Sequence, residues 1–236
     1  MATAYRRALL KLSGEALAGE RGIGLDFDAV GALADEIERV RAMGVALGVV
    51  VGGGNIIRGV TASAGGLDRV NADYMGMLAT IINALAMQDT LEKRGVHTRV
   101  MTAIRMESLA EPYIRRRALR HLEKDRVVLF AGGTGNPFFS TDTAAVLRAL
   151  EMEAEVLLKA TNVDGVFTSD PKVNPDAEFL PQLSFHDALV NGYEVMDANA
   201  FGLCKANRLP IAVFNIKEPD AIVRTLRGER VGTLVS

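Results

Sequence analysis

The chain has 236 residues, 49% of them hydrophobic and 24% charged, with a formal net charge of −2. This length and composition are typical of a globular protein with a sizeable core, which excludes the disordered and fibrous classes. The nearly balanced charge gives no general attraction to nucleic acid or to a membrane surface, so an anion must be bound by locally placed Lys, Arg and backbone N–H groups.

The first 20 residues imitate a secretory signal, with Arg6 and Arg7 ahead of an apolar stretch. Because Lys11 and Glu15 interrupt that stretch, we expect no secretory signal. No uncharged apolar run approaches the ~18 residues that span a bilayer, so we expect no membrane partner. The one cysteine, Cys204, permits no internal disulfide and fits a reducing, cytoplasmic location.

Strand-forming runs alternate with helical patterns along the chain. We expect strands at 8–12, 45–51, 97–103, 126–131, 154–160, 210–216 and 232–236, and helices near 26–43, 68–94, 112–124, 142–150 and 218–227. Near-continuous apolar strands between helices predict an α/β fold with a mostly parallel sheet covered on both faces. Residues 168–187 carry three prolines and little periodicity, which predicts a long ordered loop. We see no linker, so residues 1–236 are expected to form one domain.

Glycine-rich or polar loops follow four of these strands, and ligands of such sheets bind beyond the carboxyl ends of the strands. In "KLSGE", Lys11, Ser13 and Gly14 place an ammonium group, a hydroxyl and backbone N–H groups together, as phosphoryl binding requires. The alternative is a solvated edge lysine. In "VVVGGGNIIRG" (49–59), three glycines permit close backbone approach and Arg58 suits a phosphate; the alternative is a tight turn with a surface arginine.

The stretch "AGGTGNPFFSTDTAA" (131–145) has more small and hydroxyl-bearing residues than a turn needs. We interpret it as a loop that reads a nucleobase and helps to hold its phosphate. Within it, Asp142 either orients nearby lysines or caps the following helix.

Two further stretches are open to two interpretations. Asp73, in the first turns of the long helix, is either a surface charge favoured by the helix dipole or a ligand for ribose hydroxyls. In "EVLLKATNVDGVFTSDP", Lys159 ends a strand and Phe167 is placed to pack on a base, although turn chemistry alone explains the Asp-Gly and Asp-Pro pairs.

Several common chemistries are excluded. The chain has no G-x-x-x-x-G-K-[ST] phosphate loop and no G-x-G-x-x-G after a strand. The three histidines lack metal-ligand spacing. Arg115, Arg116, Arg117 and Arg120 have few aromatic neighbours, so we expect a solvated or subunit-contact face and no nucleic-acid partner.

Six stretches together resemble the bacterial uridylate kinases, a branch of the amino acid kinase family: "LLKLSGEAL", "GVVVGGGNIIRG", "DYMGMLAT", "AGGTGNPFFSTDTAA", "LLKATNVDGVF" and "MDANAF". The resemblance covers essentially the whole chain, in order and with matching spacing. "TGNPFFSTD" is specific to this branch, whereas "K-x-S-G" and "GGG" are shared by carbamate, acetylglutamate and aspartate kinases.

The resemblance implies an eight-stranded sheet, a homohexamer, and transfer of the ATP γ-phosphoryl group to UMP with Mg²⁺, which the nucleotide phosphates would mainly hold. It implies ATP contacts at Lys11, Leu12, Ser13, Gly14, Gly54, Arg58, Thr161, Asn162, Phe167 and Asp170. It implies UMP contacts at Gly53, Arg58, Asp73, Thr134, Gly135, Asn136, Pro137, Phe138, Phe139, Ser140 and Thr141. It implies an effector loop, with GTP and UTP as possible effectors, at Gly19, Glu20, Arg21, Gly22, Ile23 and Gly24.

Phosphoryl transfer needs two polyanions held in line and charge neutralised on the transferring group. We expect Lys11, Lys159 and Arg58 to stabilise that charge and Asp142 to orient the lysines. Two rival readings remain. A carbamate or acetylglutamate kinase leaves the base-sized loop unexplained, and a noncatalytic nucleotide-binding protein does not need Lys11 and Asp142.

Overall fold

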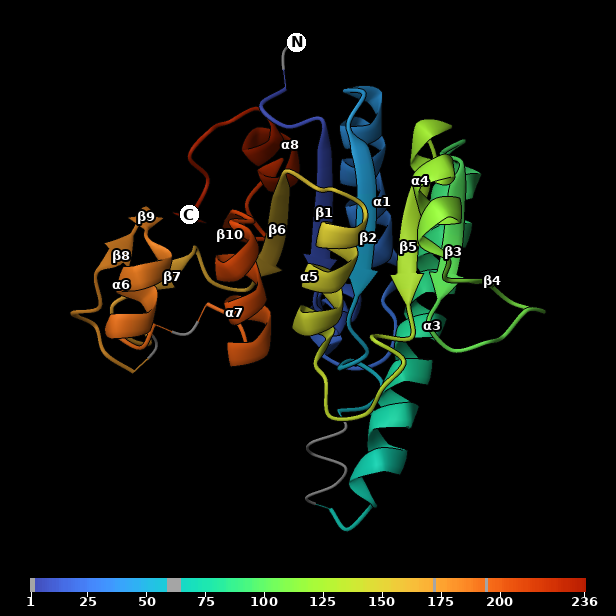
Figure 1. Ribbon diagram of the computed structural model, residues 1–236, viewed down its shortest axis with the longest axis horizontal. Coiled ribbons are helices and arrows are strands. Elements are labelled where there is room, and N and C mark those ends of the chain that lie inside the picture. The colour runs from blue at the N-terminus through green and yellow to red at the C-terminus, as the bar shows by residue number, and fades with distance from the viewer. Residues whose placement is uncertain (1–2, 59–64, 172, 194) are drawn as a thin grey trace.

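The computed structural model describes residues 3–58, 65–171, 173–193 and 195–236 (Figure 1). Gly59 of the predicted phosphate loop and Lys172 of the predicted long loop lie outside the described residues. The described residues form a sheet of nine strands in the order β4-β3-β5-β2-β1-β6-β10-β11-β9. These strands are β1 (Arg7–Leu12), β2 (Ala46–Val51), β3 (Thr98–Thr102), β4 (Glu111–Pro112), β5 (Val127–Ala131), β6 (Val156–Thr161), β9 (Gln182–Leu183), β10 (Ile211–Asn215) and β11 (Thr233–Val235). A separate antiparallel pair is formed by β7 (Val166–Phe167) and β8 (Phe179–Leu180).

Helices cover both faces of the large sheet (Figure 1). One face packs against α1 (Phe27–Ala42), α3 (Arg69–Lys93) and α8 (Ala221–Leu226). The other packs against α4 (Arg115–Glu123), α5 (Thr141–Glu151), α6 (Phe185–Val190) and α7 (Ala198–Asn207). Two short 3-10 turns follow β1, namely η1 (Gly14–Leu17) and η2 (Gly19–Arg21).

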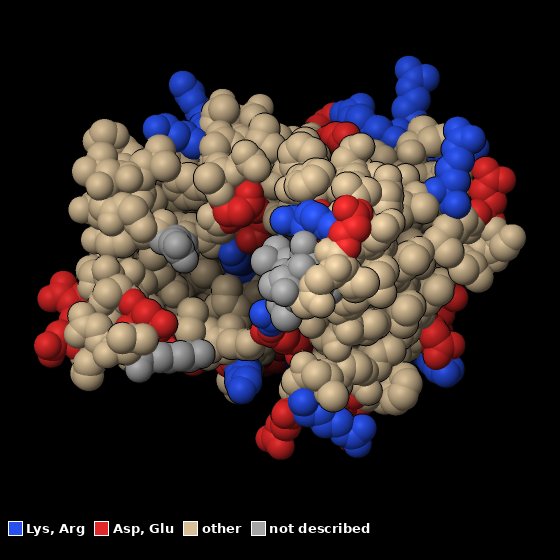
Figure 2. All heavy atoms as spheres, turned by 90° about the horizontal axis from the view of Figure 1, so that it is seen from below, with Lys and Arg blue, Asp and Glu red and all other residues tan. Residues whose placement is uncertain are grey.

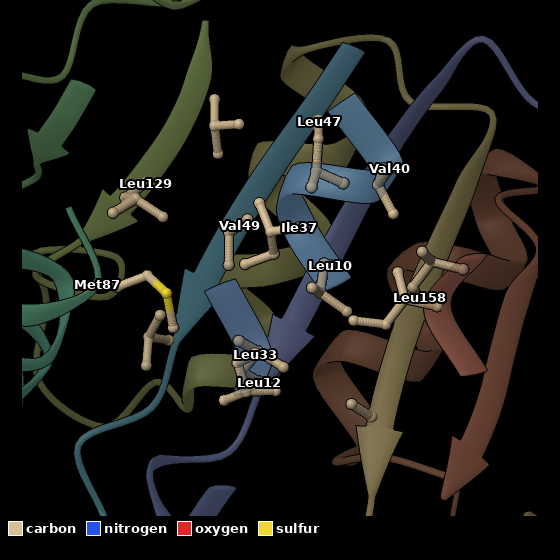
Figure 3. Packing of buried hydrophobic residues seen from close by; sticks show 14 of the residues in the cluster. Leu10, Leu12, Leu33, Ile37, Val40, Leu47, Val49, Met87, Leu129 and Leu158 are labelled. Carbon is tan, nitrogen blue, oxygen red and sulfur yellow. The ribbon is translucent and has the colours of Figure 1, made fainter. Parts of the chain in front are cut away.

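The core forms because strand side chains alternate between the two faces. Leu10, Val49 and Leu129 point to the α1 side, where they pack with Ile37 of α1 and Met87 of α3 (Figure 3). Their sequence neighbours belong to the core on the α5 side. Burying each such aliphatic side chain stabilises the fold by about 1.5–3 kcal/mol relative to exposure. This two-sided burial explains why the central strands are apolar throughout.

The expected α/β class and mostly parallel sheet are confirmed. In the large sheet only the β10–β11 pair is antiparallel. Every expected strand and helix is present, with ends that differ by at most three residues. The expected count of eight strands is wrong, because the two-residue strands β4 and β9 extend the sheet to nine at its two edges. None of the described helices is both long enough and apolar enough to cross a membrane.

The predicted loop at 168–187 is wrong in part, because it contains β8, β9 and the start of α6. Strands of two residues are too short to show a period of two in the sequence. The sequence interpretation also missed α7, whose Gly202 and two asparagines lower its helix propensity. Burial of Ala200, Phe201 and Cys204 against the sheet stabilises α7 instead.

Candidate active site

The carboxyl ends of β1, β2, β5 and β6 meet at one edge of the sheet, the lower edge in Figure 1, because these neighbouring strands are parallel. The loops that follow them gather at this edge, as the sequence predicted. Figure 2 looks onto the same edge and shows a hollow with basic and acidic side chains around it.

A cluster of two lysines and one carboxylate lies where β1 and β6 end. Lys11 and Lys159 are directly opposite each other in the β1–β6 register, so their side chains project from the same face of the sheet. Asp142 reaches both of them from the first turn of α5. Lys11 Nζ lies 2.8 Å from Asp142 Oδ1, as an ion pair outside hydrogen-bond geometry, and Lys159 Nζ donates to Asp142 Oδ2 at 2.9 Å. Lys159 Nζ also donates to the Val195 carbonyl oxygen at 2.5 Å.

The start of α5 places Asp142 in this cluster. The N-cap of α5 is Ser140, whose Oγ accepts from the Thr143 N–H at 3.0 Å. The alternative that Asp142 serves only as the helix cap is therefore wrong. Its carboxylate is free to face the lysines, and its place in the first turn is favoured by the helix dipole.

The side chains of the cluster are 13–14% exposed, so burial and charge both act on their protonation. Burial alone would raise the pKa of Asp142, but the positive charges of Lys11 and Lys159 outweigh it and hold that pKa below its usual range. Burial lowers the pKa of Lys159 despite the attraction of Asp142. Two ammonium groups share one carboxylate, which leaves the cluster able to attract an anion.

The glycines after β1 and β2 bring two loops and a helix into backbone contact. A Cβ atom on Gly14 would lie 2.7 Å from the Gly54 nitrogen, and one on Gly53 would lie 2.6 Å from the Gly76 carbonyl oxygen. Real Cβ atoms do not approach so closely, so only glycine fits at these two positions. The glycine run therefore serves loop packing, and Gly53 and Gly54 also line the first cavity described below.

Two buried asparagines that the sequence interpretation missed tie these loops together. Asn83 of α3 donates to the Gly52 carbonyl oxygen and to Asn55 Oδ1, both at 2.7 Å. Asn55 in turn donates to the Gly24 carbonyl oxygen at 2.6 Å and accepts from the Gly24 N–H at 2.8 Å. Their signal in the sequence is Asn83, an amide side chain among the apolar residues Ile81, Ala84 and Met87 of the long helix. The link connects the predicted effector loop with the loop after β2.

A first cavity of about 310 Å³ opens beside α3 and the loop after β5. Of the residues predicted for UMP, it is lined by Gly53, Arg58, Asp73, Thr134, Phe138, Phe139, Ser140 and Thr141. Gly54, predicted for ATP, also lines it. The lining residues that no prediction included are Ile57, Arg69, Gly76, Met77, Thr80 and Gly133.

Three residues predicted for UMP, Gly135, Asn136 and Pro137, do not line this cavity. They form the tip of the loop, where Asn136 N–H donates to Thr134 Oγ1 at 3.1 Å. Gly135 needs its glycine because its φ is +81°. These residues therefore shape the loop from outside the cavity.

Arg58, from the loop after β2, and Asp73, from α3, both line the first cavity. Arg58 forms an ion pair with Glu15 of η1, which joins the loops after β1 and β2. Asp73 accepts hydrogen bonds from Arg69 Nε at 2.9 Å and from the Phe138 N–H at 2.7 Å. Burial alone would raise the pKa of Asp73, but these donors hold it below its usual range.

A second cavity of about 450 Å³ opens beside the β6–β7 loop. Phe167 and Asp170, both predicted for ATP, line it together with Tyr193, which no prediction included. The Phe167 ring makes an edge-to-face contact with Phe179, with 5.4 Å between ring centroids. Phe167 therefore adds an aromatic side chain to a lining that contains both apolar residues, such as Val163, and polar residues, such as Ser169.

The remaining predicted ATP residues do not line either of these cavities. Leu12 is buried in the core, and Ser13 caps η1 by accepting from the Ala16 N–H at 3.3 Å. Thr161 donates to the Val163 carbonyl oxygen at 2.7 Å and so shapes the β6–β7 turn, in which Asn162 is exposed.

The predicted effector loop stands apart from both cavities. Gly19, Gly22 and Gly24 all have positive φ, and residues 20–24 are exposed. In the described parts of the chain, no group of three or more His, Cys, Asp or Glu side chains is placed to hold a metal ion.

Residues 6–215 match the model of the amino acid kinase family. The structure of a UMP kinase from Bacillus anthracis is 44% identical, with a TM-score of 0.95 over 98% of this chain and 96% of that one. A UMP kinase from Ureaplasma parvum is 40% identical, with a TM-score of 0.93 over 98% of each chain. A uridylate kinase from Archaeoglobus fulgidus is 28% identical, with a TM-score of 0.75 over 97% and 99%.

The chain belongs to the amino acid kinase family. The family resemblance inferred from the six sequence stretches is thereby confirmed.

The cluster predicts a pH-dependent stability effect. Asp142→Asn leaves two lysines without their carboxylate and should lower the free energy of unfolding by about 3–5 kcal/mol at neutral pH. Because the folded-state pKa of Asp142 is lowered, its contribution is present above the unfolded-state pKa and is lost as pH falls through the folded-state value. The difference between wild type and variant in denaturant unfolding should therefore shrink in acid.

Asp89→Asn is the control, since Asp89 is an exposed partner of Lys93 and should change stability by less than about 0.5 kcal/mol. A wild-type to Asp142→Asn difference that does not vary with pH would contradict the charge assignment.

Proposed function

We propose that the protein is an ATP-dependent UMP kinase that transfers the γ-phosphoryl group of ATP to UMP and forms UDP. The observation that carries the proposal is the Lys11–Asp142–Lys159 cluster, which lies at β1 and β6. In this part of the sheet the strand order is β5-β2-β1-β6. The first cavity, at the loops after β2 and β5, therefore lies on one side of the cluster. The second cavity, at the β6–β7 loop, lies on the other side. The high similarity to two UMP kinases supports the same reading.

In this proposal UMP occupies the first cavity and the ATP base lies in the second. The two phosphate chains then meet over Lys11 and Lys159, whose positive charge stabilises the transferring group. Arg58, which lines the first cavity, lies toward the UMP phosphate. Asp142 holds both lysines in position through its two carboxylate oxygens. The UMP phosphate is an adequate nucleophile, so no general base is required.

Mg²⁺ is the proposed cofactor and would neutralise negative charge on the ATP phosphates when bound. The residues present fit an ion held mainly by those phosphates, because both oxygens of Asp142 already face lysines. In this proposal Asp142 therefore forms ion pairs with the lysines and is not a metal ligand.

Carbamate and acetylglutamate, the acceptors of other kinases in the family, are smaller molecules than UMP. They leave the size of the first cavity and the Thr134–Thr141 loop unexplained. A noncatalytic nucleotide-binding protein has no use for the lysine cluster. Mixing the protein with ATP, Mg²⁺ and each of UMP, carbamate and acetylglutamate, and following ADP release, separates these readings. ADP formation with UMP alone supports the proposal. If none of the three acceptors gives ADP, the proposal is excluded.

We also propose a homohexamer in the cytoplasm, regulated by GTP and UTP through residues 19–24. Self-association is supported by apolar side chains exposed on one side of α3, namely Tyr74, Met75, Leu78 and Ile82. Regulation is supported by the Asn55 link from Gly24 to the loop after β2, and assays with added GTP or UTP test it. The location is supported by the presence of one cysteine, Cys204, which permits no internal disulfide and fits a reducing compartment.

The first activity prediction concerns Lys11. Lys11→Ala should lower kcat by about 100-fold or more, the scale for removing one preorganised donor. Thermal unfolding should change little, and Lys93→Ala, which removes an exposed lysine of α3, should leave kcat unchanged. Near-normal turnover by Lys11→Ala would remove Lys11 from the mechanism.

The second concerns base choice. Uracil presents an N3–H donor and an O4 acceptor where cytosine presents an acceptor and a donor, so a site built for one edge leaves buried groups unpaired against the other. We expect kcat/KM for UMP to exceed that for CMP by about 10³-fold or more. Thr134→Ala should weaken UMP without producing a good CMP kinase. A UMP to CMP ratio within about tenfold would mean that this loop does not read the base.

The third concerns assembly. Light scattering should give the mass of six chains for the wild type. Leu78→Lys places a charge on the exposed apolar side of α3 and should shift the mass toward smaller species, because a buried unpaired charge costs several kcal/mol. Glu38→Lys, on the exposed side of α1, is the control. A wild-type mass of one chain would contradict the assembly.

A further inference from the structure

Arg69 is the first residue of α3 and lines the first cavity, yet neither the sequence motifs nor the proposed function assigns it a role. It lies one helical turn before Asp73, the carboxylate proposed to meet the acceptor ribose. Its guanidinium group is joined to both walls of the cavity, because it contacts α3 and the loop after β5 at once.

The contact with Asp73 fixes the direction of the carboxylate. Arg69 Nε lies 2.9 Å from Oδ1 and 2.9 Å from Oδ2, so it donates between the two oxygens. The Asp73 side chain is 11% exposed and the Arg69 side chain 36% exposed. A carboxylate held in this way cannot rotate freely about its terminal bond, and each oxygen keeps lone pairs for a further donor.

The contact with Phe138 holds the opposite wall. The Arg69 guanidinium carbon lies 5.3 Å from the centre of the Phe138 ring, within the range of a cation–π interaction. Phe138 has a φ of +70°, an unfavourable conformation for a residue other than glycine, and its N–H donates to Asp73 Oδ2 at 2.7 Å. Arg69, Asp73 and Phe138 therefore form one closed set of contacts across the cavity wall.

The chemistry of this set matches a ribose. The two oxygens of one oriented carboxylate can accept from two adjacent hydroxyls, the 2′-OH and 3′-OH. A 2′-deoxyribose offers only one of these donors, so the carboxylate loses one of its two hydrogen bonds to the ligand. Loss of orientation at Asp73 would reduce this discrimination.

We propose that Arg69 is a positioning residue that orients the Asp73 carboxylate toward the two ribose hydroxyls and so sets the preference for a ribonucleotide over a 2′-deoxyribonucleotide acceptor. This inference rests on the proposed function, because it takes UMP as the occupant of the first cavity. Arg69 acts through Asp73 and is not a catalytic residue.

The test compares Arg69→Gln with wild type, using UMP and dUMP as acceptors. We expect KM for UMP to rise about tenfold or more, the scale for losing a hydrogen bond to a charged group, with kcat and the KM for ATP nearly unchanged. KM for dUMP should rise less, so the UMP to dUMP preference falls. Lys93→Gln is the matched control, because Lys93 pairs with Asp89 at the same spacing on the same helix and is 72% exposed. It should change neither constant.

A double substitution tests whether Arg69 acts through Asp73. In an Asp73→Asn background, Arg69→Gln should change KM for UMP by less than about twofold, because the group that it orients has already lost its charge. Arg69→Lys, which keeps the charge but lacks the planar guanidinium, should fall between wild type and Arg69→Gln and also serves if Arg69→Gln does not fold.

Three results would overturn the proposal: equal weakening of UMP and dUMP, fully additive effects of Arg69→Gln and Asp73→Asn, or no change in Arg69→Gln. Calorimetric binding of UMP and dUMP separates this inference from the proposed function. Binding that prefers UMP in an Arg69-dependent way without turnover would overturn the kinase activity and keep the Arg69 assignment. Turnover of UMP with no preference over dUMP would keep the kinase activity and overturn the Arg69 assignment.

Discussion

The site depends on one constraint, which is that two lysines end neighbouring parallel strands in direct register. Lys11 and Lys159 project from the same face of the sheet and are largely buried, and two ammonium groups so placed would repel each other without an anion between them. Asp142 supplies that anion, and it can do so because Ser140 takes the capping position of α5. The strand register, the start of α5 and the charge of the cluster are therefore parts of one electrostatic arrangement.

Backbone packing around this cluster explains much of the glycine content. Gly14 and Gly53 allow the loops after β1 and β2 and the helix α3 to touch through main-chain atoms. Asn83 then donates to the Gly52 carbonyl group beside this close packing, and Asn55 donates to the carbonyl group of Gly24 in the neighbouring loop. A movement of the loop at residues 19–24 would act on Asn55 and so on the loop after β2, which gives the proposed regulation a physical route of hydrogen bonds.

The two cavities differ in how their walls are held. The first is closed by charged contacts between α3 and the loop after β5, in which Arg69, Asp73 and Phe138 depend on one another. The second is lined by the Phe167 ring, which packs edge-to-face on Phe179, and by loop residues such as Thr168 and Ser169. Directional contacts suit a ligand chosen by its hydroxyl groups and base edge, whereas an aromatic ring packs on any flat base. This contrast agrees with the proposed use of the first cavity for UMP and of the second for the ATP base.

Local sequence determined the α/β class, the central strands and the loops that carry the site, because strand and helix periods and glycine clusters are properties of neighbouring residues. It also singled out Lys11, Asp142 and Lys159. Only the tertiary structure decided that these three meet, that Ser140 and not Asp142 caps α5, and that Asn83 and Arg69 belong to the site at all. A polar residue on a helix face has no local signature of its partner, since the partner comes from a distant segment of the chain. The two-residue strands and α7 were missed for the same reason, because the sheet they pack against stabilises them and their own residue pattern does not.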